Sequence, residues 1–168
     1  RRSSDLQLVI PLMSVCMSLC CNGFQTATSK IVAEKPQNRQ IILICAIIMS
    51  ATIALLLTII MYSNANYISL CILSEPRCTE LVKALSFSIL PAAIHSCING
   101  YYYGLKKEAV PAATQLIEQT ARIGNCYLIY AILSDGGSCF KPVYSIYGIV
   151  AGEASATVFS VITIKKDF

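Results

Sequence analysis

The stretch Ile41–Tyr62, IILICAIIMSATIALLLTIIMY, decides the class of this protein because it contains no charged residue. A helix needs about 20 mainly apolar residues to cross the hydrocarbon core of a bilayer. This stretch is long enough to do so. It also lacks the continuous polar face that a helix on the surface of a soluble protein presents to water. We therefore expect a transmembrane helix here.

The composition of the whole chain indicates the same class. Of the 168 residues, 55% are hydrophobic and only 13% are charged, and the mean hydropathy is +0.63. Soluble globular domains carry about 25% charged residues, so this chain has too few ionisable groups to cover a surface that faces water. The same scarcity excludes a disordered chain and a nucleic-acid-binding protein, for which a net charge of +4 gives no support. We therefore expect the protein to lie in a lipid bilayer.

Four further stretches have the length and hydropathy of a membrane span. Proline inside such a span is tolerated, because neighbouring helices can satisfy the backbone groups that it leaves free. The sequence therefore predicts an all-α membrane protein with one membrane domain over residues 1–168. Its chain does not begin with Met, and its first apolar segment is too long for a cleaved signal, so we expect a piece of a longer protein. The expected spans are residues 6–28, 41–62, 84–103, 109–133 and 143–164.

Basic residues in the connections predict the orientation, because Lys and Arg accumulate on the cytoplasmic side of a membrane. With five spans, seven basic residues fall on one side and five on the other. We expect the richer side to be cytoplasmic, which places the start of the chain outside and its end inside. The richer side holds Lys30, Lys35, Arg39, Lys106, Lys107, Lys165 and Lys166, and the other holds Arg1, Arg2, Arg77, Lys83 and Lys141.

The span over residues 109–133 carries a polar stripe formed by Gln115, Glu118, Gln119 and Arg122. Their spacing of three and four residues places them on one face of a helix. Glu118 and Arg122 can pair, which lowers the cost of holding either charge in lipid, and a lone charge at the bilayer centre costs roughly 2.5 to 3.5 kcal/mol on insertion scales. Two interpretations stay open: the stripe lines a substrate or ion path, or it is a structural ion pair between helices.

Three other residues within predicted spans are candidate site residues. His95 and Asn99 lie one helical turn apart, and histidine titrates near neutral pH, so a proton-coupling role is conceivable. A buried, hydrogen-bonded histidine is the interpretation we favour, because no carboxylate accompanies it in the same span. Glu153 is the remaining acid, and it can pair with Arg122 or His95 across helices or take part in cation binding. The sequence does not choose between these.

No pattern in the chain is typical of a catalytic or cofactor site. There is no nucleophile with a base, no metal-ligand spacing and no phosphate-binding loop, so we expect neither an enzyme nor a cofactor. Cys16 and Cys20 lie one turn apart but have no His or carboxylate beside them. Buried cysteine behaves as a small hydrophobe, and an odd total of nine argues against a complete disulfide framework. Three cysteines, Cys71, Cys78 and Cys139, are expected in loops, where they could oxidise.

Three motifs resemble those of a known transporter family. The first is the run Gly23–Lys35, which contains Ser-Lys-Ile-Val-Ala-Glu. The second is Pro91 followed by Gly100-Tyr101 and Gly104; these two glycines four residues apart also permit close helix packing. The third is the stripe described above. In order and spacing they resemble the stage V sporulation protein B group of polysaccharide transporters, within the multidrug/oligosaccharidyl-lipid/polysaccharide flippase superfamily.

The resemblance implies that the five spans are helices two to six of a MATE-like transporter, and so most of one six-helix lobe. A first helix and a second lobe would complete the cavity, and the chain alone would not transport. The implied function is export or flipping of a lipid-linked oligosaccharide or polysaccharide precursor at the cell membrane, in spore cortex or cell-wall synthesis. Arg122 is the expected partner of the substrate pyrophosphate. Alternatives are a cation-coupled multidrug efflux antiporter and a non-transporting membrane scaffold for wall-synthesis enzymes.

Overall fold

The computed structural model describes residues 11, 14–34, 36–73, 78–135 and 142–167, and every regular element among them is a helix. The all-α prediction is therefore confirmed. Short π-helical, 3-10 and α segments extend or connect the long helices. Their bounds are η1 Ser18–Asn22, α2 Gly23–Glu34, η2 Pro36–Asn38, α3 Arg39–Ser63, α4 Ala65–Tyr67, η3 Ile68–Ile72, α5 Thr79–Gly104, α6 Ala109–Asp135 and α7 Pro142–Asp167.

Prolines mark several helix boundaries. Pro142 is the first residue of α7 and Pro111 lies in the first turn of α6, where a missing N–H is harmless because the first turn has no intrahelical acceptor. Pro36 follows α2 and starts the short connection to α3. Pro91 is different, because it lies inside α5. Helices α3, α5, α6 and α7 lie over four of the predicted spans, and α5 begins five residues earlier than residue 84, at Thr79. The first predicted span, residues 6–28, overlaps α2 only from Gly23, and α2 continues to Glu34.

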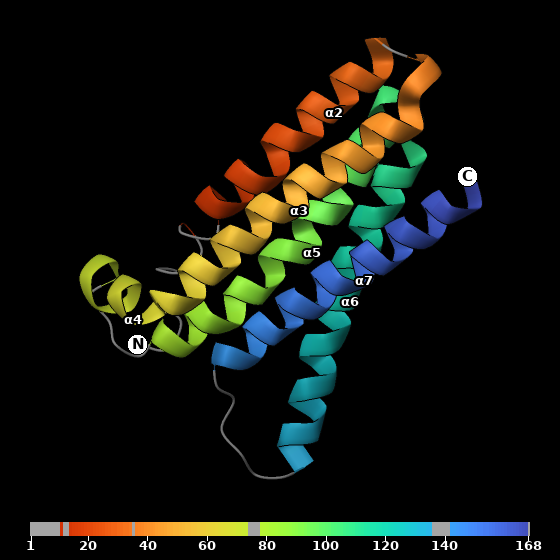
Figure 1. The fold of residues 1–168 in the computed structure, drawn as a ribbon. Coiled ribbons are helices and arrows are strands. Elements are labelled where there is room, and N and C mark those ends of the chain that lie inside the picture. The colour runs from red at the N-terminus through yellow and green to blue at the C-terminus, as the bar shows by residue number, and fades with distance from the viewer. Residues whose placement is uncertain (1–10, 12–13, 35, 74–77, 136–141, 168) are drawn as a thin grey trace.

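Helix α5 is the centre of the bundle. In its most apolar stretch 72% of the residues are buried, against 17% for α3. Helices α2, α3 and α7 all pack on α5, and α6 packs mainly on α7 (Figure 1). Apolar side chains on the outer face of α3 are exposed, as expected for contact with lipid. They include Ile41, Ile44, Ile48, Met49, Ile53, Leu55, Leu56, Ile59 and Ile60.

Within the described residues, three helices are long and apolar enough to cross a membrane, namely α3, α5 and α7 from Ile146 onward. This supports the membrane class. The spans at residues 6–28 and 109–133 stay predictions. Residues 6–10 and 12–13 lie outside the described part, and the polar stripe lowers the mean hydropathy of α6. The connection from α2 to α3, the connection from α5 to α6 and the C-terminal end lie toward one end of the bundle (Figure 1), which is the arrangement that the charge analysis requires.

Two apolar clusters fill the core, and a polar layer separates them along α5. The first cluster contains α5 residues up to Ala93, and the second contains Ile98, Tyr101 and Tyr102 with Val32 of α2. His95 and Ser96 lie between the clusters, and both are buried. The candidate site is built from this layer.

Helix α2 packs closely on the end of α5, because two glycines leave room for its backbone. A Cβ added at Gly100 would lie 2.5 Å from the carbonyl oxygen of Gln25, and one at Gly104 would lie 2.7 Å from that of Ser29. The packing role predicted for these glycines is confirmed. Of the three tyrosines between them, Tyr101 and Tyr102 are buried and only Tyr103 is exposed.

Substituting Gly100 by alanine should loosen the α2–α5 contact. We expect Gly100→Ala to lower the free energy of unfolding by about 1–3 kcal/mol, as for other overpacked sites, measured by thermal or denaturant unfolding in detergent. Gly124→Ala is the matched control, because it is also a helical glycine and its Cβ would meet nothing within 4 Å. That variant should be neutral or more stable by up to about 1 kcal/mol. Equal effects of the two substitutions would contradict the close packing.

The turn between α5 and α6 places Lys106 in the left-handed region, with φ of 59°. The amide of Lys106 donates to Tyr103 and that of Lys107 donates to Tyr102, both at 3.0 Å. This is the Schellman pattern, in which the residue with positive φ is usually glycine.

We expect Lys106→Gly to raise the free energy of unfolding by about 1 kcal/mol, because a side chain in the left-handed conformation costs roughly that much. Lys106→Ala is the control, since it removes the charge but keeps the Cβ. The strain explanation is wrong if both variants shift the thermal unfolding midpoint equally.

Candidate functional site: a buried charge cluster between three helices

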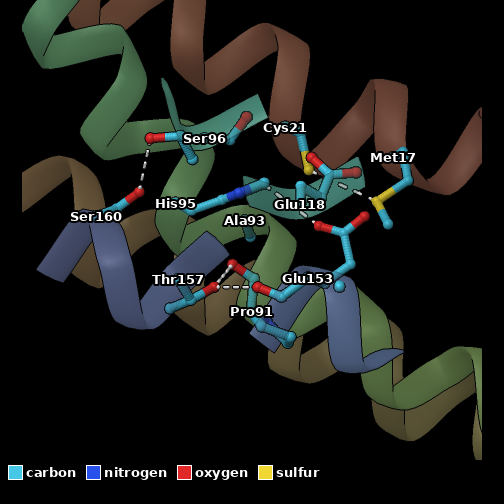
Figure 2. A network of polar contacts seen from close by, with 12 residues as sticks. Met17, Cys21, Pro91, Ala93, His95, Ser96, Glu118, Glu153, Thr157 and Ser160 are labelled. Carbon is cyan, nitrogen blue, oxygen red and sulfur yellow. Dashed lines mark hydrogen bonds and ion pairs between the residues drawn. The ribbon is translucent and has the colours of Figure 1, made fainter. Parts of the chain in front are cut away.

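Four of the predicted site residues meet between α5, α6 and α7. His95 comes from α5, Glu118 and Arg122 come from α6, and Glu153 comes from α7. His95 and Glu153 are buried, and Glu118 and Arg122 are partly buried. Figure 2 shows His95, Glu118 and Glu153 converging on one region. We call these four residues the charge cluster.

Arg122 joins the two acids of the charge cluster. Its Nη2 lies 2.5 Å from Oε1 of Glu118, one turn before it, and 3.3 Å from Oε1 of Glu153 across the α6–α7 contact. The first contact is the i, i+4 pair that the sequence predicted. The second is one of the alternatives left open for Glu153. One guanidinium therefore faces two carboxylates.

Glu153 also reaches His95, which was the other alternative. Nε2 of His95 lies 3.3 Å from Oε2 of Glu153. The geometry does not make a hydrogen bond, and neither Oε2 of Glu153 nor Nδ1 of His95 has a hydrogen-bond partner among the described residues. His95 is buried as expected, and the ionisable partner that it contacts among the described residues is an acid of another helix.

The charge cluster depends on close packing of α7 against its neighbours. A Cβ at Gly152 would lie 3.1 Å from the carbonyl oxygen of Glu118, so glycine permits the approach that brings Glu153 to α6. One turn later, the hydroxyl of Thr157 lies 2.8 Å from the carbonyl oxygens of Pro91 and Glu153. This contact fixes α7 against α5 one turn before His95.

A pocket of about 270 Å³ lies beside the charge cluster. Three of its lining residues precede α2 or lie in the π-helical segment η1, and π-helical segments are frequent at functional sites. Cys21 donates to Sδ of Met17 at 3.8 Å, so two sulfur atoms border the pocket. This pocket could not be predicted, because no pattern in the sequence relates residues 14–21 to His95. The lining residues are Ser14, Met17, Cys21, Ala92, His95, Glu118 and Glu153.

The other predicted site residues do not join the charge cluster. Gln115 and Gln119 are exposed on α6, so only the Glu118–Arg122 half of the predicted stripe points into the bundle. Asn99 is half-buried on α5, and its Oδ1 is buried without a hydrogen-bond partner among the described residues.

The cysteines make no disulfide in the described part of the chain. Cys71 is exposed, as expected, although it lies in the helical segment η3. Oxidation of Cys78 was expected only if its loop faced outward. Cys78 directly precedes α5 and is fully buried, so this condition is not met. Cys16 contacts Sδ of Met61 at 3.3 Å. The side chain of Cys20 and all of Cys139 lie outside the described residues.

We expect Arg122→Gln to destabilise the bundle, because it leaves two neighbouring carboxylates without their cation. The loss should be smaller than the about 3–5 kcal/mol found when one partner of a buried pair is removed, since 30% of the Arg122 side chain is exposed. Unfolding in detergent measures it. Adding Glu153→Gln to Arg122→Gln should recover part of the loss, and strictly additive effects would show that the two groups do not interact.

Comparisons with known proteins give no match for this chain: no protein-family model, no curated protein and no solved structure resembles it detectably. The family assignment therefore stays a prediction from the three motifs.

Proposed function

We propose that this chain is part of a membrane transporter that exports or flips a lipid-linked oligosaccharide or polysaccharide precursor across the cell membrane. The observation that carries the proposal is Arg122, whose guanidinium contacts two carboxylates and still leaves 30% of its side chain exposed. Ionisable groups inside a membrane bundle are rare and costly to maintain, and they mark substrate, ion or proton paths.

The geometry suggests how such a group serves transport. Arg122 is held by Glu118 and Glu153, so its charge is compensated while no substrate is present. A pyrophosphate is an alternative anionic partner for a guanidinium, with several oxygens for charge-assisted hydrogen bonds. When Arg122 turns to the substrate, the contact between α6 and α7 through Glu153 is released. Substrate binding would then be linked to movement of these helices.

The substrate class rests on the resemblance to the stage V sporulation protein B group. That resemblance also suggests spore cortex or cell-wall synthesis as the process, and it implies a further helix and a second lobe as partners that complete the cavity. Exposed Gln115 and Gln119 lie on the same helix as Arg122, and they are available to a substrate or to a neighbouring lobe.

A second candidate is cation-coupled multidrug efflux, which the contact between His95 and Glu153 favours. An acid beside an imidazole in a buried layer can carry a proton or another cation. Efflux of a dye driven by a proton or sodium gradient would distinguish this function from flipping. A non-transporting scaffold for wall-synthesis enzymes would instead keep its function after every buried charge had been neutralised.

The transport proposal is tested in liposomes that contain the protein to which this chain belongs, with a fluorescent lipid-linked oligosaccharide whose outer-leaflet fraction is quenched chemically. We expect flipping above that of protein-free liposomes, and at least a tenfold loss with Arg122→Ala. Thr120→Ala is the matched control, since Thr120 is exposed on the same helix outside the charge cluster and its hydroxyl donates to the carbonyl oxygen of Leu116 in that helix, and it should retain the rate.

The amount of folded Arg122→Ala protein is measured by size-exclusion chromatography, so that a loss of transport is not confused with a loss of fold. Wild-type flipping by folded Arg122→Ala would leave only a structural role for the ion pair.

A further inference from the structure

The charge cluster contains a set of atoms that the transport proposal does not use. One ring nitrogen of His95 and one carboxylate oxygen from each of Glu118 and Glu153 all lie within 4.8 Å of one another. They come from three different helices, α5, α6 and α7. A group of one imidazole and two carboxylates is a donor set that first-row divalent metals accept.

The distance between His95 and Glu153 fits two side chains that bind the same metal ion. Two ligand atoms bound to a tetrahedral metal at about 2.0–2.2 Å lie about 3.3–3.6 Å apart, and Nε2 of His95 is 3.3 Å from Oε2 of Glu153. The side chain of Glu153 is only 7% exposed. Its Oε2 has no hydrogen-bond partner among the described residues, although a buried carboxylate oxygen left unpaired is costly.

We propose that His95, Glu118 and Glu153 bind a first-row divalent transition-metal ion, of the class of Zn²⁺ or Mn²⁺, at the junction of α5, α6 and α7. Glu118 offers the third ligand atom, within 4.8 Å of the other two. Bound metal would tie the three helices together. The site stands on these contacts alone, whatever the protein transports.

The charge balance attracts a cation to this position. Two carboxylates and one guanidinium give a net charge of −1 when the imidazole is neutral, which is the form that binds metal. Arg122 contacts Oε1 of both acids, so Oε2 of Glu153 is left for the metal. Arg122 is then a competitor of the ion for the same carboxylates.

The pocket beside the charge cluster gives an ion space to approach His95, Glu118 and Glu153. The imidazole of His95 favours a transition metal over Na⁺ or Ca²⁺. Alkali and alkaline-earth ions prefer sites made of oxygen alone, whereas an imidazole nitrogen suits Zn²⁺ and its neighbours.

The experiment is a titration of the purified protein in nanodiscs with Co²⁺, whose visible d–d absorption reports coordination by nitrogen and oxygen. We expect one Co²⁺ per chain, displaced by Zn²⁺. His95→Gln and Glu153→Gln should each weaken binding by at least about 100-fold, because losing a residue that only supports a ligand already costs about 10–100-fold. Gln119→Ala is the control and should bind like the wild type.

Arg122→Gln separates a metal site from a merely structural cluster. It removes the competing cation, so this variant should bind Co²⁺ as tightly as the wild type or more tightly, even though we expect it to be less stable. Size-exclusion chromatography and helical circular dichroism establish that each variant is folded.

Three results would overturn the proposal: no d–d absorption with the wild type, equal binding by wild type and folded His95→Gln, or thiolate-to-cobalt charge-transfer bands showing that cysteines bind the ion. In the first case, proton release or uptake without metal binding would assign the charge cluster to a proton alone. Failure of metal binding leaves the flipping measurement unaffected, and failure of flipping leaves the metal site unaffected.

Discussion

The burial of Glu153 in the middle of the helix bundle is the constraint on which the rest of the site depends. A carboxylate that is 7% exposed must be compensated, because a charge in a low-dielectric interior is costly without a partner. Arg122 and His95 lie on opposite oxygens of this carboxylate. Each partner comes from a different helix, so keeping Glu153 compensated also fixes how α5, α6 and α7 lie relative to one another.

Small residues and one hydroxyl make this arrangement possible. At Gly152 a Cβ would lie 3.1 Å from the carbonyl oxygen of Glu118, so glycine allows the close approach of α7 to α6 that brings Glu153 to Arg122. The hydroxyl of Thr157 contacts the carbonyl oxygen of Pro91, within the part of α5 where the proline removes a backbone donor. In lipid, interhelical packing and hydrogen bonds replace the hydrophobic effect as the source of helix association. The polar layer therefore stabilises the bundle and forms the site at once.

Local patterns in the sequence predicted the features that lie within a single helix. The charge-free run Ile41–Tyr62 became the core of α3, and the i, i+4 spacing of Glu118 and Arg122 became an ion pair. Features that result from the packing of two helices could not be predicted from the sequence. A helical face of about 100° holds both Gln119 and Glu118, and only the packing of α7 decides that Glu118 points inward while Gln119 is exposed.

The proposed anion and cation binding would be linked, because both use Glu153. Arg122 compensates this carboxylate, so an anionic substrate that draws Arg122 away leaves Glu153 and Glu118 more negative and raises their affinity for a cation. A cation bound between His95 and Glu153 does the reverse: it compensates the acids and frees Arg122 for an anion. By thermodynamic reciprocity, each ligand then favours the other to the same extent. The exchange would affect the packing of the helices, because the four acids and bases of the charge cluster belong to three helices.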